Sequence, residues 1–171
     1  KIKDYRLVEA QSADTIDRDT YLQATVLSIE ESLRLEFEIL KQLLGLHTIA
    51  LFLFDEAKKR LKLVYAISDT MDNLVDEKIE CDIGVFGAIL KNNEPIIINS
   101  EDRSVKGQVY YKKNMKIKAF IGAVVNEHIK DITLSRGVII GDRMEGIFDE
   151  SMKNIFKRLS EFLGSYVQTQ R

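Results

Sequence analysis

The sequence predicts an α+β domain, and three features of the chain lead to this prediction. Long stretches near both ends repeat apolar residues every three or four positions, which is the spacing of one helix face. Between them, short segments are either almost continuously apolar or alternate between apolar and polar residues, as β-strands do. The chain has 171 residues, of which 45% are apolar, so it has the size of one globular domain with helical extensions.

The composition excludes several classes of function. The 25 basic and 27 acidic side chains nearly cancel, so no nucleic-acid partner is expected. The single cysteine, Cys81, excludes an internal disulfide and a multi-thiolate metal site, and it suits a cytoplasmic location. No apolar run approaches the roughly 18 residues of a membrane span, so we expect no direct membrane contact. Because the sequence begins at Lys1 and stops inside a helical pattern, we expect it to be part of a longer protein.

Residues 1–18 carry mixed charge without periodicity and are interpreted as a linker, and residues 19–171 as one domain. The domain opens with a helix over residues 19–45 that ends at Gly45. A second apolar row on this helix, Leu27, Ile39 and Leu43, is expected to face the sheet. The helix either packs only on its own domain or also pairs with a copy of itself, which apolar residues on more than one face favour. Its main apolar face consists of Leu22, Val26, Ile29, Leu33, Phe37, Leu40 and Leu44.

Three strands are expected next. Residues 47–54 are almost continuously apolar, which predicts a middle strand, and residues 61–68 alternate and complete a hairpin. Residues 78–83 predict a third strand with Ile79, Cys81 and Ile83 facing inward. The acidic loop before this strand lacks the spacing of a calcium-binding loop, so a solvated loop is the preferred interpretation.

Residues 81–99 are expected to form the wall of a pocket. Gly84 and Gly87 open a short helix that ends before Pro95, and an isoleucine-rich strand follows. Cys81 precedes this helix, whose N-terminal amides favour a thiolate, so a redox or chromophore-binding role is one hypothesis. The preferred alternative is a small apolar core residue, because buried free cysteines are common.

Residues 100–114 show no period, and five lysines with Tyr110 and Tyr111 lie between residues 106 and 118. This segment is either a flexible flap that contacts an anionic or aromatic ligand, or a solvated loop with its tyrosines packed beneath it.

The last part of the domain should contain two strands and a helix. Two antiparallel strands are expected over residues 117–125 and 132–140, connected by residues 126–131. The final helix, over residues 148–169, carries an apolar stripe that includes Leu159, Phe162 and Tyr166.

No catalytic motif is present. The sequence contains no phosphate-binding loop, no zinc-protease motif and no nucleophile elbow, and its two histidines, His47 and His128, fall in different expected elements. The carboxylates fall in loops and on polar helix faces, where no dry site for acid–base chemistry is evident. We therefore expect no enzymatic activity from this domain.

The order of these elements resembles the GAF domain family over residues 40–167. The resemblance rests on four runs, which are GVFGAILKNNEPIIIN, IKAFIGAVV, SRGVIIGDR and FDESMKNIFKRLSEFLGSYV. It implies a central antiparallel sheet of five or six strands in an α/β sandwich, with both terminal helices on one face and the short helix and loops over the other. A PAS-like sensor fold is the alternative, and the strand order distinguishes the two.

The resemblance also implies a regulatory module that binds a small ligand, commonly a cyclic nucleotide, and pairs through its terminal helices. Cyclic GMP is not expected, because Phe148, Asp149 and Glu150 lack the preceding asparagine and lysine of the cyclic-nucleotide members. A bilin is not expected either, since Asp82 follows Cys81 where bilin-binding members carry histidine or an aromatic residue, and haem is likewise not expected. The methionine-sulfoxide reductase members use more than one cysteine, and this chain has one.

The sequence thus leads to a sensor hypothesis. A ligand shifts the paired terminal helices, and the helices in turn act on an output domain outside this stretch. That output is expected to be a kinase, a cyclic-dinucleotide enzyme or a transcription activator. The alternative is a ligand-free GAF-like scaffold for dimerisation. The candidate pocket residues are Cys81, Phe86, Asn99, Arg103, Tyr110, Tyr111 and Phe120. The candidate dimer residues are Leu22, Val26, Ile29, Leu33, Phe37, Leu159, Phe162 and Tyr166.

Overall fold

The computed structural model describes residues 18–169. Its contacts divide the chain into two units, 1–38 and 39–171, and the whole sheet belongs to the second unit. The elements in chain order are α2 (Arg18–Leu43), β1 (Thr48–Phe54), β2 (Arg60–Ser68), the 3-10 helix η1 (Met71–Asn73), β3 (Ile79–Glu80), α3 (Gly84–Leu90), β4 (Ile96–Asn99), β5 (Ala119–Ile129), β6 (Ile132–Arg143) and α4 (Glu150–Thr169).

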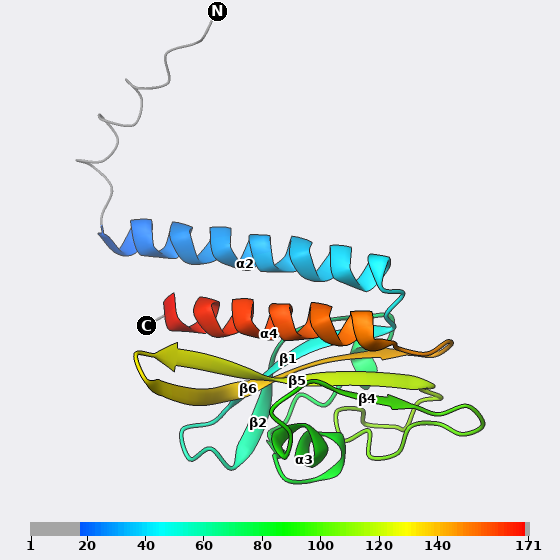
Figure 1. Ribbon diagram of the computed structural model, residues 1–171. Helices are drawn as coiled ribbons and strands as arrows, with labels where there is room; N and C mark the ends of the chain where they lie inside the picture. The colour runs from blue at the N-terminus through cyan, green and yellow to red at the C-terminus, as the bar shows by residue number, and fades with distance from the viewer. Residues whose placement is uncertain (1–17, 170–171) are drawn as a thin grey trace, which may run out of the picture. The chain divides into compact units, whose positions relative to one another are not determined.

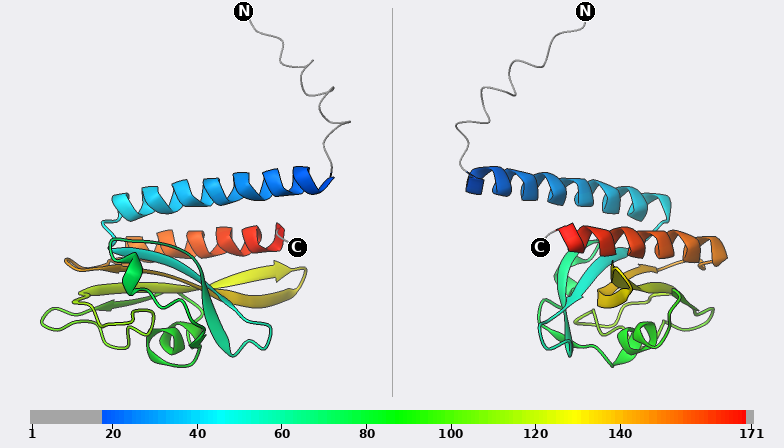
Figure 2. Two further views of the ribbon diagram at one scale, coloured as in Figure 1. Left: turned by 180° about the vertical axis from the view of Figure 1, so that it is seen from behind. Right: turned by 60° about the vertical axis from the view of Figure 1, so that its left-hand side comes forward.

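The centre of the second unit is one antiparallel sheet of six strands in the order β3-β2-β1-β6-β5-β4. Helix α4 lies along one face of this sheet, mainly over β5, and α3 with the long loops covers the other face (Figures 1 and 2). The predicted α+β class and the expected number of strands are therefore confirmed. The almost continuously apolar segment forms β1, which pairs with β2 on one edge and β6 on the other and is therefore a middle strand, as predicted.

Two apolar layers pack on the sheet, and alternation along each strand separates them. Toward α3, Phe52 on β1 and Val138 on β6 join one buried cluster with Phe86 of α3. The alternate residues of these strands are buried on the other face, toward α4. There, a side chain at Gly141 would collide with Phe156 of α4. The sheet therefore contributes to two cores, one with each helical layer.

Helix α2 ends slightly before its expected limit, and helix α4 begins slightly after its expected limit. Gly45 follows α2 with a φ of +58°, and the N–H of Leu46 donates to the carbonyl of Lys41 at 2.9 Å, so α2 ends at Leu43. At α4, the Asp149 carboxylate accepts from the N–H of Met152 at 3.2 Å. Because a capping residue lies outside the helix it caps, α4 begins at Glu150 rather than at residue 148.

Other expectations were wrong in detail. The third strand is only two residues long, and Ile83, which was expected to face inward, is 45% exposed. The connection expected over residues 126–131 is mostly strand, because β5 and β6 stay paired as far as Ile129 and Ile132 and only two residues turn between them. Polar residues at a hairpin end pair as well as apolar ones, since the pairing uses backbone groups.

Contrary to expectation, the described residues of the second apolar row of α2 do not pack on the sheet, and the side chain of Leu27 lies outside the described part of the structure. Ile39 and Leu43 are 54% and 76% exposed. An apolar row on a helix predicts contact with some partner, but periodicity alone does not identify that partner.

Candidate functional site

A buried carboxylate, Asp142, lies at the centre of the polar part of the α3-side core, near the end of β6. Its Oδ2 atom accepts hydrogen bonds from the hydroxyl groups of Tyr110 and Tyr111, each over 2.7 Å. Its Oδ1 atom accepts a third bond from the backbone N–H of Thr48 on β1, over 3.0 Å. A buried carboxylate requires such donors, and these three come from two distant parts of the chain.

Hydroxyl groups extend this network toward β2. The Tyr111 hydroxyl lies 2.6 Å from Thr48 Oγ1, which in turn lies 2.7 Å from Ser68 Oγ. Beside them, Nε2 of the nearly buried His47 is 2.9 Å from Thr70 Oγ1. The Asp142 cluster, as we name it, consists of Thr48, Ser68, Tyr110, Tyr111 and Asp142.

Aromatic rings fill the space between the Asp142 cluster and α3. The Tyr110 ring lies 6.4 Å from the Phe86 ring and 6.0 Å from the Phe120 ring, and 4.5 Å from that of Tyr111. Phe86 also contacts Phe52 edge-on at 4.9 Å. Tyr110, Phe86 and Phe120 are all fully buried, so Tyr110 occupies a position with several aromatic neighbours and a carboxylate at its hydroxyl.

Burial changes the ionisation of this cluster. It raises the pKa of the Asp142 carboxyl above its ordinary value, although the hydrogen bonds from Tyr110 and Tyr111 act in the opposite direction. Burial, reinforced by the Asp142 charge, also raises the pKa of both tyrosine hydroxyls. The tyrosines therefore remain neutral donors to Asp142 at ordinary pH.

The two tyrosines belong to a long loop between β4 and β5, residues 100–118, which we call the tyrosine loop. One contact with α3 requires glycine on both sides, because a Cβ at Gly84 or at Gly107 would collide with backbone atoms of the other. Both glycines have positive φ, and the N–H of Val85 donates to the Gly107 carbonyl at 3.0 Å. The loop thus comes close to the first turn of α3.

Two side-chain amides form hydrogen bonds with the backbone of the loop, one from a residue of the loop and one from a residue outside it. The buried Gln108 amide donates to the carbonyls of Val105 and Met115 at 2.7 and 2.8 Å and accepts from the Met115 N–H at 2.8 Å. Asn73, the last residue of η1, bonds to both the carbonyl and the N–H of Lys113, at 2.8 and 2.9 Å. The tyrosine loop is therefore an ordered segment with its own hydrogen bonds.

The structure brings together four of the seven candidate pocket residues, namely Phe86, Tyr110, Tyr111 and Phe120. Asn99 is exposed and bonds in both directions with the backbone of Phe148, each over 3.0 Å, ahead of α4. Arg103 is exposed in the tyrosine loop. These two residues therefore lie outside the aromatic group.

Cys81 lies at the edge of the α3-side core and is only partly buried. Its Sγ atom is 3.9 Å from the carbonyl of Lys58. Burial and the nearby charge of Asp82 raise the pKa of the Cys81 thiol. This is the opposite of what an activated thiolate requires, and it favours the interpretation of Cys81 as a packing residue.

The candidate dimer residues lie on α2 and α4. The side chains of Leu22, Val26 and Ile29 lie outside the described part of the structure, and Leu33 and Phe37 lie further along α2. On α4, Leu159 is buried, Tyr166 is partly buried and Phe162 is 46% exposed.

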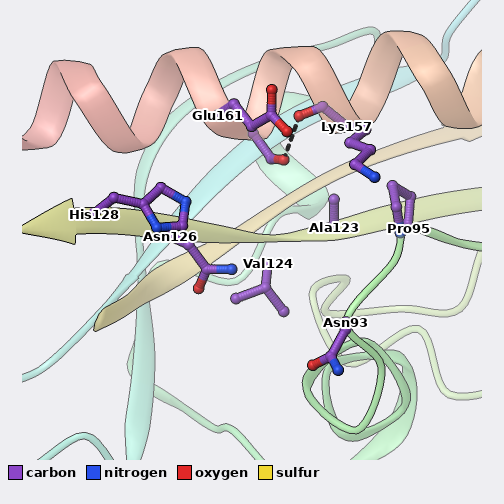
Figure 3. Close-up of a pocket in the computed structure, with 9 residues that line it drawn as sticks. Asn93, Pro95, Ala123, Val124, Asn126, His128, Lys157 and Glu161 are labelled. Carbon is purple, nitrogen blue, oxygen red and sulfur yellow. Dashed lines mark hydrogen bonds between the residues drawn. The ribbon is translucent and has the colours of Figure 1, made fainter. Parts of the chain in front are cut away.

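Two cavities lie away from the Asp142 cluster. One, of about 180 Å³, lies between α4, β5 and the segment that precedes β4, which contributes Asn93 and Pro95 (Figure 3). Lys157 at its rim forms an ion pair with Glu94 over 2.9 Å. The other, of about 580 Å³, lies at the turn between β1 and β2 and includes Asp55 and Lys78. Within residues 18–169, no group of three or more histidine, cysteine or acidic side chains is placed to hold a metal ion.

Sequence reasoning missed Asp142 and Thr48. A signal for Asp142 was available in the sequence. Asp142 follows an apolar run, and it stands two residues after Ile140 and four after Val138, so alternation places its side chain on the same inward face as theirs. Thr48 could not be recognised in this way, since a threonine at the start of a strand is common in any setting. Its role depends on Tyr111, which is distant in sequence.

Comparison with known proteins identifies the fold. No family model matches the sequence, and no curated protein matches it significantly.

None of the helices in the described part of the chain is both long and apolar enough to cross a membrane.

Several solved structures are similar. The GAF domain region of a protein from Geobacter sulfurreducens PCA aligns with a TM-score of 0.68 and 17% identity, over 87% of this chain and 99% of that one. The GAF domain of a phosphoenolpyruvate-protein phosphotransferase from Coxiella burnetii aligns with a TM-score of 0.64 and 16% identity, over 82% and 83%. The GAF domain of a two-component sensor histidine kinase from Bacillus halodurans aligns with a TM-score of 0.61 and 15% identity, over 82% and 93%. This chain therefore has the fold of the GAF domains.

Proposed function

We propose that this domain is a non-catalytic sensory and regulatory module of a larger signalling protein, and that a small ligand binds on the α3 face of the sheet in place of the Tyr110 side chain. The terminal helices pass the signal to an output such as a kinase, a cyclic-dinucleotide enzyme or a transcription activator. The proposal includes a cytoplasmic location, in keeping with the single free cysteine. Similar domains from a sensor histidine kinase and a phosphotransferase support a regulatory role.

One observation carries the ligand proposal, the buried carboxylate of Asp142 with its hydrogen-bonded tyrosines. An apolar residue at this position would serve a purely structural core as well or better, because burying a carboxylate has a large desolvation cost. A polar group retained in an aromatic surrounding is instead typical of ligand sites, where a few polar groups orient a mostly apolar ligand.

The surroundings of Tyr110 define the chemistry of the ligand. Phe86 and Phe120 lie near the ring, and Asp142 accepts from its hydroxyl. A ligand that replaces Tyr110 must therefore be a planar ring with a hydroxyl or N–H donor directed at the carboxylate. Because Tyr110 must move first, the apparent affinity is reduced by the fraction of molecules in which the site is open.

A thermal-shift screen of the domain tests this proposal, using nucleosides, phenols and aromatic amino acids as probes. A specific ligand at about 100 times its dissociation constant adds about 2.7 kcal/mol to stability. Asp142→Asn, which replaces two acceptor oxygens by one, should abolish the response, and Asn73→Ala, which loosens the loop away from Asp142, should retain it. The proposal fails if a compound stabilises the Asp142→Asn variant as strongly as the original domain.

A second candidate function is a ligand-free dimerisation scaffold. It is favoured by the complete burial of Phe86, Tyr110 and Phe120, because these side chains already occupy the space where the ligand is proposed to bind. A dimer that responds to no probe in the screen would favour the scaffold.

A face of α2 supports dimerisation in either case. Leu35, Ile39 and Leu43 are spaced four residues apart and are 48%, 54% and 76% exposed. Side chains at this spacing form one row on a helix, and exposed apolar rows of this kind commonly contact a partner. We therefore propose that a second copy of the domain covers this row.

A further inference from the structure

We propose that Asp142 and Arg143, consecutive residues at the end of β6, form a relay that couples the tyrosine loop to the segments joining both long helices to the sheet. The inference rests on the proposed sensory function and specifies how opening of the loop reaches the helices. We name the two segments the α2–β1 junction, residues 44–47, and the β6–α4 junction, residues 144–149.

The first half of the relay is the side chain of Asp142, which faces the tyrosine loop. It holds Tyr110 and Tyr111 through two hydrogen bonds to one oxygen atom. Its other oxygen accepts from the N–H of Thr48, and its backbone carbonyl accepts from the N–H of His47 at 2.8 Å. One residue thus contacts both the tyrosines and the start of β1.

The second half is Arg143, whose side chain points to the opposite face because successive residues of a strand alternate. Its Nε atom donates to the carbonyl of Leu44 at 2.7 Å, and Nη1 donates to the carbonyl of Ile147 at 2.7 Å. A further bond joins Nη2 to Leu44, and the guanidinium lies 4.6 Å from the centre of the Phe148 ring. Arg143 therefore connects the α2–β1 junction to the β6–α4 junction.

The ends of the tyrosine loop join the same assembly. The N–H of Lys118 donates to the carbonyl of Arg143, and the N–H of Ser100 donates to the carbonyl of Lys118, each at 2.8 Å. Asn99, immediately before the loop, bonds in both directions with the backbone of Phe148. A displacement of the loop consequently acts on β6 and on the β6–α4 junction together.

This arrangement gives the coupling a short path. When Tyr110 and Tyr111 leave Asp142, the buried carboxylate loses two of its three donors and must find others or shift with β6. Any such shift changes the position of the Arg143 backbone, and its guanidinium cannot keep both carbonyl partners unless the junctions follow. Effects along such contacts typically change local opening equilibria by roughly 2- to 30-fold.

Hydrogen exchange of the ligand-free domain, followed by mass spectrometry, tests the relay. In Tyr110→Phe/Tyr111→Phe, which removes both hydroxyls and keeps both rings, we expect exchange in residues 44–47 and 144–149, the two junctions, to accelerate roughly 2- to 30-fold. Exchange in residues 60–66 of β2, which precede Ser68 and lie outside the Asp142 cluster, should change much less. If the double variant does not fold, Tyr110→Phe alone removes one of the two bonds.

Asn73→Ala is the matched control, because it removes the bonds of Asn73 to Lys113 and does not touch Asp142. It should accelerate exchange within residues 110–114 and leave both junctions unchanged. Equal acceleration of the junctions in the control and in the tyrosine variant would overturn the relay, and so would acceleration spread evenly over β2 and the junctions.

The reverse direction provides a second test, since coupling between two sites is reciprocal. Arg143→Lys keeps the charge but cannot reach both carbonyls with a planar fork, and it should accelerate exchange in residues 105–117. Unchanged loop exchange in this variant would overturn the relay. Because both tests use the domain without ligand, a failed ligand screen leaves the relay standing, and a failed relay leaves the ligand site standing.

Discussion

At the scale of single residues, Asp142 illustrates how a fold changes the chemistry of a side chain. The carboxylate is fully buried, yet it accepts three hydrogen bonds from Thr48, Tyr110 and Tyr111. The donors reduce the cost of burial but do not cancel it, so the pKa of the Asp142 carboxyl stays raised. The charged residue that holds the tyrosine loop in place is thus also a source of instability at neutral pH.

This balance predicts a pH dependence for Asp142→Asn. Because the pKa of the carboxyl is raised in the folded state above its unfolded value, near 3.8, the stability that it contributes is fully present below that value. The contribution is lost as the pH rises through the folded pKa. The stability of the original domain relative to Asp142→Asn should therefore be greatest in acid and decline toward neutrality.

Urea unfolding of both proteins at several values between about pH 3 and pH 7 measures this difference, in which carboxyls common to both proteins cancel. A difference in unfolding free energy that stays constant or grows with rising pH would contradict the prediction.

At the scale of elements, the seating of α4 on the sheet depends on one small residue. Gly164 lies in the last turns of α4, where a Cβ would collide with the backbone carbonyl of Asn126 on β5. The helix therefore approaches the strand more closely than any side chain at this position permits. The close contact lies near the irregularity in β5–β6 pairing at Val125 and Asn126.

Gly164→Ala tests this contact. Alanine normally stabilises a helix interior by about 1 kcal/mol relative to glycine, but here the collision is with backbone, so the helix must move away. We expect a loss of about 1–3 kcal/mol in the free energy of unfolding, measured by urea denaturation. Ser165→Ala, at the neighbouring exposed position, should change stability by less than about 0.5 kcal/mol. A Gly164→Ala variant as stable as the original domain would show that α4 is not seated through this contact.

At the scale of the whole molecule, association is proposed to use the exposed row of α2. Ile39→Glu places a charge in the middle of this row, and burying an unpaired charge in an interface has a large cost. Sedimentation velocity over a range of concentrations should show a dimer for the original domain and a monomer for the variant.

Val64→Glu is the control, because Val64 is 54% exposed on β2 and lies away from α2 in sequence. It should leave the dimer intact. A domain that stays monomeric at high concentration, or an Ile39→Glu variant that still dimerises, would refute dimerisation through this row.

Sequence reasoning determined the elements of this protein well. The apolar run of β1, the alternation of β2 and the stripe of α4 are local patterns, and each records how a segment meets its surroundings. Gly45 and Pro95 marked element ends for reasons of backbone geometry that need no tertiary information. Of the two interpretations of residues 100–114, the loop with its tyrosines packed beneath it is confirmed, since Tyr110 and Tyr111 are buried.

Only the tertiary structure decided how these parts meet. Asp142 reads as an ordinary strand-end acid until Tyr110, Tyr111 and Thr48 converge on it, and Asn99 reads as a pocket residue until it bonds to Phe148. The exposure of Ile39 and Leu43 likewise depends on which segments cover that helix face. The physical reason is the same in each case, because periodicity records that a side chain needs a neighbour, whereas burial and hydrogen bonding depend on distant residues that folding brings to it.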